Sequence, residues 1–243
     1  MTAAALRTGV LGLAAALLAA QASAGRAAEP LPPLVALDVG HSHARPGAVS
    51  ARGVPEFEFN LALARRIEAE LAAAGIGARL IGADGLADDL FARSPQAAGT
   101  RLLLSIHHDS VQEKYLRPWT YGGEARRHTT HARGWSLYVS RRTPREAASL
   151  ACAAAIGRSL AAAGLPIARH HRDPATGKPR PWADHAAGVH YYDNLIVLRT
   201  AEVPAVLLEA GVILHRDEEK LLSRDAYRAK LARRIVAGIR RCL

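Results

Sequence analysis

The sequence predicts an α/β fold: a single domain with a mostly parallel, twisted sheet and helices on both faces. Two observations support this prediction. Short apolar runs rich in Val, Ile and Leu recur along the chain, as expected for strands buried on both faces of a parallel sheet. Between these runs, apolar residues recur every third or fourth position, which is the spacing of a helix. Strands that alternate with helices predict a doubly wound sheet.

Three strands and two helices are expected in the first half of the chain. The apolar run 35–41 predicts the first strand. A helix follows, whose apolar residues recur every fourth position: Phe59, Leu63, Ile67 and Leu71. Gly75 marks the end of this helix, because glycine is common just past a helix C-terminus. Residues 78–81 and 102–107 predict two further strands, with a helix around residues 86–91 between them.

Three more strands are expected in the second half, at residues 135–139, 195–198 and 203–209. Residues 146–163 predict an Ala-rich helix. A closing helix has an apolar face and a basic face: Tyr227, Leu231, Ile235 and Ile239 on the first, and Arg228, Lys230, Arg233, Arg234 and Arg240 on the second. Two polar stretches, 112–134 and 170–192, predict long loops, which in compact domains are commonly binding segments or lids.

The N-terminus predicts export. Residues 1–24 have the pattern of a signal peptide, because Arg7 precedes an apolar stretch and Ala22-Ser23-Ala24 supplies small residues for cleavage. The apolar stretch is shorter than the roughly 20 residues that span a bilayer, so a cleaved leader is favoured over a retained membrane anchor. We expect no stable membrane span after cleavage. Residues 25–33 form a Pro-rich lead-in, and residues 34–243 form the domain. The expected location is the periplasm or cell envelope.

The chain is strongly basic, with a formal net charge of +10. Arg7 is the only charged residue of the expected leader, so the mature chain carries one charge less, +9. A basic surface favours an anionic partner, and for an exported protein an envelope polymer or membrane surface is a better candidate than nucleic acid. The charge is equally well explained as a solubility trait of an Arg-rich and Ala-rich protein.

The chain has two cysteines, Cys152 and Cys242, both in segments with helical patterns. Neither belongs to a zinc-type cluster. An oxidising compartment would permit a disulfide between them, but both residues also suit the role of small buried hydrophobes. We expect them to be unpaired.

Three of the predicted strands end on a polar side chain: His41, His107 and Glu209. Open α/β sheets bind ligands beyond the carboxyl ends of their strands, so these groups are expected at one edge. Glu56 stands at the start of the first predicted helix. Taken singly, each signal is weak: Glu56 suits a first helical turn, and Glu209 could pair with one of many arginines. Together they predict a site.

The chemistry of this set is that of a zinc hydrolase. Catalytic zinc takes three protein ligands from His and carboxylates and leaves a position for water, and His41, Glu56 and His107 supply such a set. The metal lowers the pKa of the water and polarises a carbonyl. Glu209 could then move the proton from the water to the departing amine, as general base and then general acid. Asp38 could orient one of these ligands without binding the metal itself.

Five strings of the sequence occur in an order that carries a resemblance: Asp38-Val39-Gly40-His41, Pro46-Gly47-Ala48, Glu56 with Asn60-Leu61-Ala62, Ser105-Ile106-His107, and residues 203–211 (VPAVLLEAG). In these strings the chain resembles the catalytic domain of the zinc-dependent N-acetylmuramoyl-L-alanine amidases of the amidase-3 type, from about Leu34 to the C-terminus. The resemblance implies the zinc-exopeptidase, or phosphorylase/hydrolase-like, version of the α/β fold.

The resemblance also implies residue roles and a substrate. It makes His41, Glu56 and His107 the zinc ligands and Glu209 the catalytic acid or base, acting on the amide between N-acetylmuramic acid and L-alanine in peptidoglycan. Glu58 competes with Glu56, but the family ligand lies four residues before the Asn-Leu pair, which favours Glu56. Two histidines depart from the family pattern, His43 and His108, and both are expected to be neighbours or substrate contacts. The sequence leaves open whether an activator protein is needed.

Two alternatives remain at this stage. The first is a zinc peptidase of related fold that acts on cell-wall peptides. The second is a non-catalytic, basic envelope-binding protein, against which stands the presence of all four expected site residues. A nucleic-acid partner is not expected.

Overall fold

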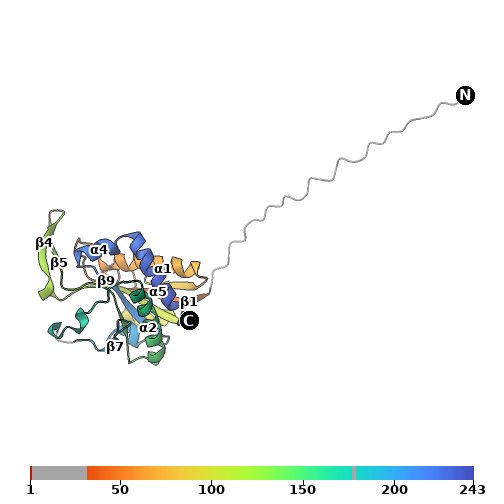
Figure 1. Ribbon diagram of the computed structural model, residues 1–243. Coiled ribbons are helices and arrows are strands. Elements are labelled where there is room, and N and C mark those ends of the chain that lie inside the picture. The colour runs from red at the N-terminus through yellow and green to blue at the C-terminus, as the bar shows by residue number, and fades with distance from the viewer. Residues whose placement is uncertain (2–31, 177–178) are drawn as a thin grey trace. The chain divides into compact units, whose positions relative to one another are not determined.

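A twisted sheet runs through the described part of the chain, which comprises Met1 and residues 32–176 and 179–243 of a computed structural model (Figure 1). Within these residues, seven strands pair in the order β2-β1-β3-β9-β6-β8-β7. Four of them run parallel side by side: β2 (Gly77–Ile81), β1 (Pro33–Val39), β3 (Leu102–Asp109) and β9 (Ala205–Val212). The mostly parallel sheet of the sequence prediction is confirmed. The expected signal peptide lies outside the described residues, except for Met1.

The second half of the sheet reverses direction at β6 (Ser136–Val139), which pairs antiparallel with β9. Strand β8 (Val189–Tyr191) then runs parallel to β6, and β7 (Trp182–Asp184) closes the edge antiparallel to β8. Residues 170–192, expected to be a loop, therefore supply the last two strands at this side of the sheet, β8 and the edge strand β7. They also contain two short 3₁₀ helices, η4 (His170–Arg172) and η5 (Pro174–Thr176).

Helices cover both faces of the sheet. Three long ones form the main core with the strands: α1 (Glu56–Ala73), α2 (Glu146–Ala162) and α5 (Asp225–Ile239). Val35, Leu37 and Val39 of β1 point into this core, whereas Ala36 points to a smaller cluster on the opposite face. The helix α3 (Ile196–Arg199) and the 3₁₀ helix η2 (Ser94–Ala97) contribute to that second cluster. Both faces of β1 are thus buried, which explains its continuous apolar sequence.

Two predicted elements are wrong. Residues 195–198 were expected to be a strand but mostly form α3, because a short apolar run suits a buried helix as well as a buried strand. The helix expected around residues 86–91 is replaced by irregular chain and the 3₁₀ helix η1 (Leu90–Ala92). Leu86 and Phe91 are 75% and 55% exposed, so their spacing does not mark a core face.

The remaining elements are a 3₁₀ helix, a hairpin and one short helix. The polar stretch 112–134, predicted as a loop, holds the 3₁₀ helix η3 (Glu113–Tyr115) and a hairpin of β4 (Arg117–Tyr121) and β5 (Glu124–His128). The hairpin projects from the side of the domain (Figure 1). The helix α4 (Arg216–Leu222) follows β9. In the described part of the chain, no helix combines the length and apolar character needed to cross a membrane.

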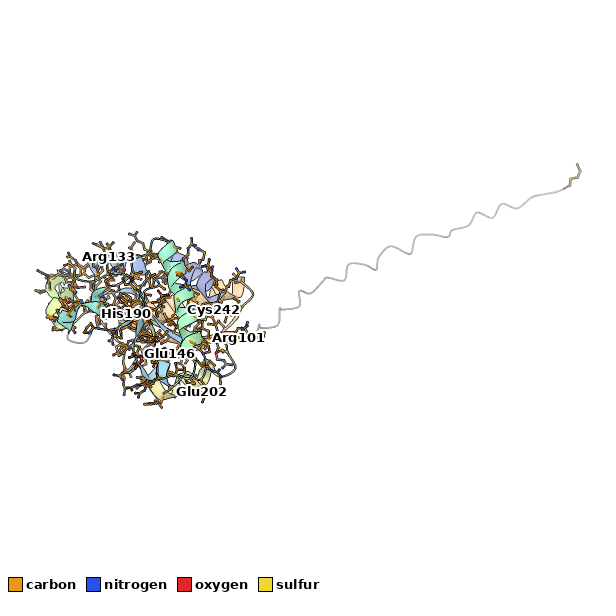
Figure 2. All side chains as sticks on the ribbon, turned by 60° about the horizontal axis from the view of Figure 1, so that its bottom comes forward. Arg101, Arg133, Glu146, His190, Glu202 and Cys242 are labelled. Carbon is orange, nitrogen blue, oxygen red and sulfur yellow. A yellow bond between two sulfur atoms is a disulfide. The ribbon has the colours of Figure 1, made fainter. Side chains whose placement is uncertain are left out.

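The two cysteines form a disulfide, so the expectation of unpaired thiols is wrong. Cys152 lies within α2, and Cys242 follows the end of α5 (Figure 2). Their Cα atoms are 5.1 Å apart although 90 positions separate them in the sequence. The packing of α5 against α2 brings them together, and helical patterning alone does not reveal which helices pack side by side.

The burial of His190 on β8 is expected to make the stability of the fold sensitive to acid. His190 is fully buried, and its ring stacks on that of Trp182 with centroids 3.8 Å apart. Burial lowers the pKa of His190 to about 3, with the charge of His171 acting in the same direction. The folded protein therefore keeps this ring neutral, whereas the unfolded chain binds a proton below the ordinary pKa of 6.5. The stability that comes from keeping His190 neutral is fully present above pH 6.5 and is lost as the pH falls below it.

We expect His190 to cost the protein roughly 2 kcal/mol of unfolding free energy between pH 7 and pH 5. Urea unfolding at both pH values measures the loss. His190→Phe keeps an aromatic ring but cannot titrate, so its pH-dependent loss should be smaller by this amount. Equal losses in the parent and the variant would contradict the prediction.

Candidate active site

Three side chains converge at the carboxyl edge of the parallel strands. His41 follows β1, His107 lies near the end of β3, and Glu56 is the first residue of α1. One carboxylate oxygen, Glu56 Oε1, lies 3.0 Å from His41 Nε2 and 3.1 Å from His107 Nδ1. The three candidate ligand atoms all lie within 4.8 Å of one another. The parallel arrangement of β1 and β3 accounts for this meeting, because their carboxyl ends share one edge.

Two glycines make room for these side chains. A Cβ atom at Gly40 would lie 2.4 Å from the ring of His107. A Cβ atom at Gly47, which also has a φ of +80°, would lie 2.5 Å from Glu56 Oε2. His41 itself has a φ of 72°, a left-handed conformation that is unusual for a residue other than glycine. The backbone is therefore shaped around the three side chains.

The donor set suits a zinc ion. Two imidazoles and one carboxylate, with a position left for water, are typical of catalytic zinc. Burial alone would raise the pKa of Glu56, but hydrogen bonds and charges from His107 and His41 outweigh it and hold the pKa far below its ordinary value. Glu56 is therefore ionised, as a metal ligand must be. Glu58, the competing carboxylate, is exposed and lies outside this group.

Glu209 lies beside this group on the neighbouring strand. In the pairing of β3 with β9, Glu209 is the partner of His107. Its Oε2 atom is buried and has no hydrogen-bond partner within residues 32–176 and 179–243. Burial raises the pKa of Glu209 well above its ordinary value, and the negative charges of Asp109 and Glu56 raise it further, against the opposing charge of Arg180. A raised pKa lets a carboxyl group hold a proton more readily than an ordinary glutamate does, which suits an acid or base in catalysis.

Asp38 supports the site through an arginine. Its Oδ1 accepts a hydrogen bond of 2.6 Å from Arg93, and its Oδ2 accepts one of 2.6 Å from Ser105. Arg93 also donates to the backbone carbonyls of Val39 and His41. Asp38 thus acts on the backbone that carries His41, and does not contact a ligand imidazole directly. Both Asp38 and Arg93 are 1% exposed.

The two additional histidines lie outside the group of three. His43 is exposed, and its ring packs edge-on against Phe57 with centroids 4.9 Å apart. His108 is buried behind Glu56, and its Nδ1 lies 2.8 Å from Asn60 Oδ1. Burial lowers the pKa of His108 to about 3 against the opposing charge of Glu56, so this ring is neutral. His108 also donates its backbone N–H to Glu56 Oε1 over 3.2 Å.

We expect Asp38→Asn to lower the free energy of unfolding by about 3 kcal/mol, because it leaves the guanidinium of Arg93 buried without an opposite charge. Denaturant unfolding measures this loss. Asp193→Asn is the matched control, since Asp193 pairs with the more exposed Arg141 at 2.6 Å and such surface pairs contribute about 1 kcal/mol or less. Equal losses in the two variants would show that burial does not make the Asp38–Arg93 pair more important for stability than a surface pair.

Three residues of the site, Gly40, Asn60 and Arg93, were given no role on the basis of the sequence. Asn60 donates to the carbonyl of Gly40 over 3.1 Å and to Glu56 Oε1 over 3.3 Å. Arg93 belongs to a segment without clear periodicity, so nothing in the sequence pointed to its burial. Gly40 and Asn60 were present in the recognised strings, and that is the signal which could have identified them.

A cavity lies beside the two histidines of the group. His41 and His107 line a cavity of about 500 Å³ together with apolar side chains such as Leu90 and Ile196. A second cavity, of about 970 Å³, is lined by Asp109, His171, Arg180 and residues of the segment 191–194. The described site therefore has space for a ligand beside its polar groups.

Comparison with known proteins identifies the family of the chain. Residues 35–241 match the family described as N-acetylmuramoyl-L-alanine amidase, Amidase_3. The amidase AmiA of Salmonella typhimurium is 28% identical over 234 residues, which cover 85% of this chain and 74% of AmiA.

Solved structures share the fold. The amidase Ami1 of Mycobacterium smegmatis superposes with a TM-score of 0.68 at 21% identity, covering 86% of this chain and 96% of Ami1. The CwlD amidase of Clostridioides difficile, solved in complex with the GerS lipoprotein, has a TM-score of 0.59 at 18% identity, covering 86% of this chain and 96% of CwlD. With a family match across nearly all of the described domain, the chain belongs to the Amidase_3 family of N-acetylmuramoyl-L-alanine amidases.

Proposed function

We propose that the chain is an exported zinc hydrolase that cleaves the amide between N-acetylmuramic acid and L-alanine in peptidoglycan. The observation that carries this proposal is the meeting of His41, Glu56 and His107 next to Glu209 at one edge of the sheet. Family membership supports the peptidoglycan amidase activity. The metal, the role of Glu209 and the export are the steps that we add.

His41, Glu56 and His107 would hold the zinc ion. Zinc, when bound, supplies a Lewis acid that polarises the amide carbonyl and lowers the pKa of water. Glu209 accepts the proton of the attacking water and then delivers it to the nitrogen of L-alanine as the amide bond breaks. Its raised pKa serves both steps, because the carboxyl group holds the proton between them. Arg93 and Asp38 fix the backbone at His41, so the ligands keep their positions.

We further propose that residues 1–24 direct the chain to the cell envelope, where its substrate is found. The pattern of a basic residue, an apolar stretch and a small-residue cleavage site supports this step. CwlD is bound to a lipoprotein in its structure, which supports a protein activator as a regulator of this chain too. N-terminal sequencing of the protein recovered from the envelope tests the leader, with Gly25 expected as the first residue.

Mass spectrometry of soluble products tests the activity. The zinc-loaded mature protein is incubated with purified peptidoglycan, beside a control treated with EDTA. We expect free stem peptides that begin with L-alanine, and none in the control. Cleavage within the peptides would instead identify a zinc peptidase. Binding to peptidoglycan without release of peptides, whether or not zinc is present, would favour the envelope-binding alternative.

A further inference from the structure

A second group of potential metal ligands lies beyond the end of β3. It consists of Asp109, the last residue of β3, and the neighbouring pair His170 and His171 in η4. Their ligand atoms all lie within 4.8 Å of one another. We propose that Asp109, His170 and His171 bind a second divalent metal ion of the zinc type.

The arrangement matches that of the first group. In both, two imidazole nitrogens approach the same carboxylate oxygen. Asp109 Oδ2 lies 2.6 Å from His171 Nε2 and 3.2 Å from His170 Nε2. Two imidazoles and one carboxylate are a common protein ligand set for zinc. Thiolate ligands would have indicated a softer metal ion, and oxygen ligands alone a harder one such as Mg²⁺ or Ca²⁺.

The state of His170 is the independent observation that points to a ligand. Its side chain is only 8% exposed, yet neither ring nitrogen has a hydrogen-bond partner in the described part of the protein. Nε2 lies 3.2 Å from Asp109 Oδ2, which is the distance of an ion pair, but the two groups do not have the geometry of a hydrogen bond. Leaving a buried polar atom unpaired costs free energy, so such atoms usually have a partner. A metal ion between Asp109 and the two rings would give Nε2 that partner.

The surroundings suit an ion. Side-chain exposure is 9% for Asp109 and 14% for His171, so the group is shielded on most sides. It still lines the larger cavity, which leaves a coordination position open on that side. Arg180 lines the same cavity, and its positive charge would favour an anionic ligand there.

Hydrogen bonding alone is the competing explanation. In that case Asp109 accepts a hydrogen bond from His171 and holds η4 against the end of β3 without any metal. This alternative explains His171, but it leaves the buried ring of His170 with an ion-pair contact to Asp109 and no hydrogen bond at either ring nitrogen. A metal ion accounts for both histidines, and it would fix the segment at η4 to the same strand that carries His107.

Counting zinc per chain tests the proposal separately from the proposed function. The untagged mature protein is loaded with Zn²⁺, dialysed and analysed by elemental mass spectrometry. We expect two zinc ions per chain in the parent, one in Glu56→Gln and one in the double variant His170→Ala/His171→Ala. His185→Ala should retain two, because His185 is an exposed histidine of the same segment.

The variants distinguish the two sites. One zinc ion in the parent that is lost in Glu56→Gln and kept in the double variant would overturn the second site. One ion that is lost only in the double variant would support the second site and contradict the first. No bound zinc in the parent would overturn both.

Asp109→Asn provides a second test of the site in case the double variant does not fold. Asparagine keeps the size of the side chain and can still accept the 2.7 Å hydrogen bond from the backbone N–H of Ser110. We expect this variant to bind one zinc ion and to show the same far-ultraviolet circular dichroism as the parent. Two zinc ions in a folded Asp109→Asn protein would overturn the assignment of Asp109.

Discussion

Glu209→Gln is expected to lower the rate of peptide release from peptidoglycan by about 10²- to 10⁴-fold, the usual contribution of a general acid or base. Glutamine has nearly the same shape as glutamate but cannot accept the proton of water. The proposed zinc ligands His41, Glu56 and His107 do not lie on β9, so zinc bound by them should remain. Initial rates of peptide release and zinc content, measured on the same preparation, check both parts.

Glu202→Gln is the matched control for this prediction. Glu202 is an exposed glutamate three residues before the start of β9, in the segment that leads to Glu209 (Figure 2). We expect its activity and its zinc content to equal those of the parent. Full activity in Glu209→Gln would remove the proposed role of Glu209, whereas loss of zinc would indicate that this variant disturbs the ligands.

The double variant Cys152→Ala/Cys242→Ala is expected to lose about 4 kcal/mol of unfolding free energy. The disulfide closes a long loop, because 90 positions separate its cysteines. In the chain-entropy description, such a crosslink limits the freedom of the unfolded chain and so favours the folded state. Guanidinium unfolding of the parent and the double variant measures the difference.

A reducing agent supplies the control for the disulfide. Dithiothreitol should lower the unfolding midpoint of the parent toward that of the double variant and should leave the variant unchanged. A parent whose midpoint equals that of the variant under oxidising conditions would show that the disulfide does not stabilise the fold.

The parts of the fold that could be predicted are those in which burial imposes a repeating pattern. Strand β3 is buried along most of its length and α1 presents one apolar face, so both stand out in the sequence. His41 follows the end of β1, and His107 and Glu209 lie in the carboxyl halves of β3 and β9, which is the pattern that pointed to this edge of the sheet. Glu56 was chosen over Glu58 by resemblance, and the geometry groups Glu56 with the two histidines.

What could not be predicted depends on contacts between distant segments. Cys152 and Cys242 meet only because α2 and α5 pack together. Arg93 and His170 come from segments without periodicity, and their burial follows from the elements that surround them. The run at 195–198 is too short for its period to separate a strand from a helix, so its misassignment has the same origin.

The two glycines at the first group give a criterion for sorting relatives of this chain. A relative can keep all three ligands and Glu209 and still fail to assemble the centre, if a side chain replaces Gly40 or Gly47. The added Cβ atom would meet His107 or Glu56, and these groups could not move aside and still fill the proposed ligand roles. A survey for working enzymes should therefore require glycine at both positions, in addition to the residues that perform the chemistry.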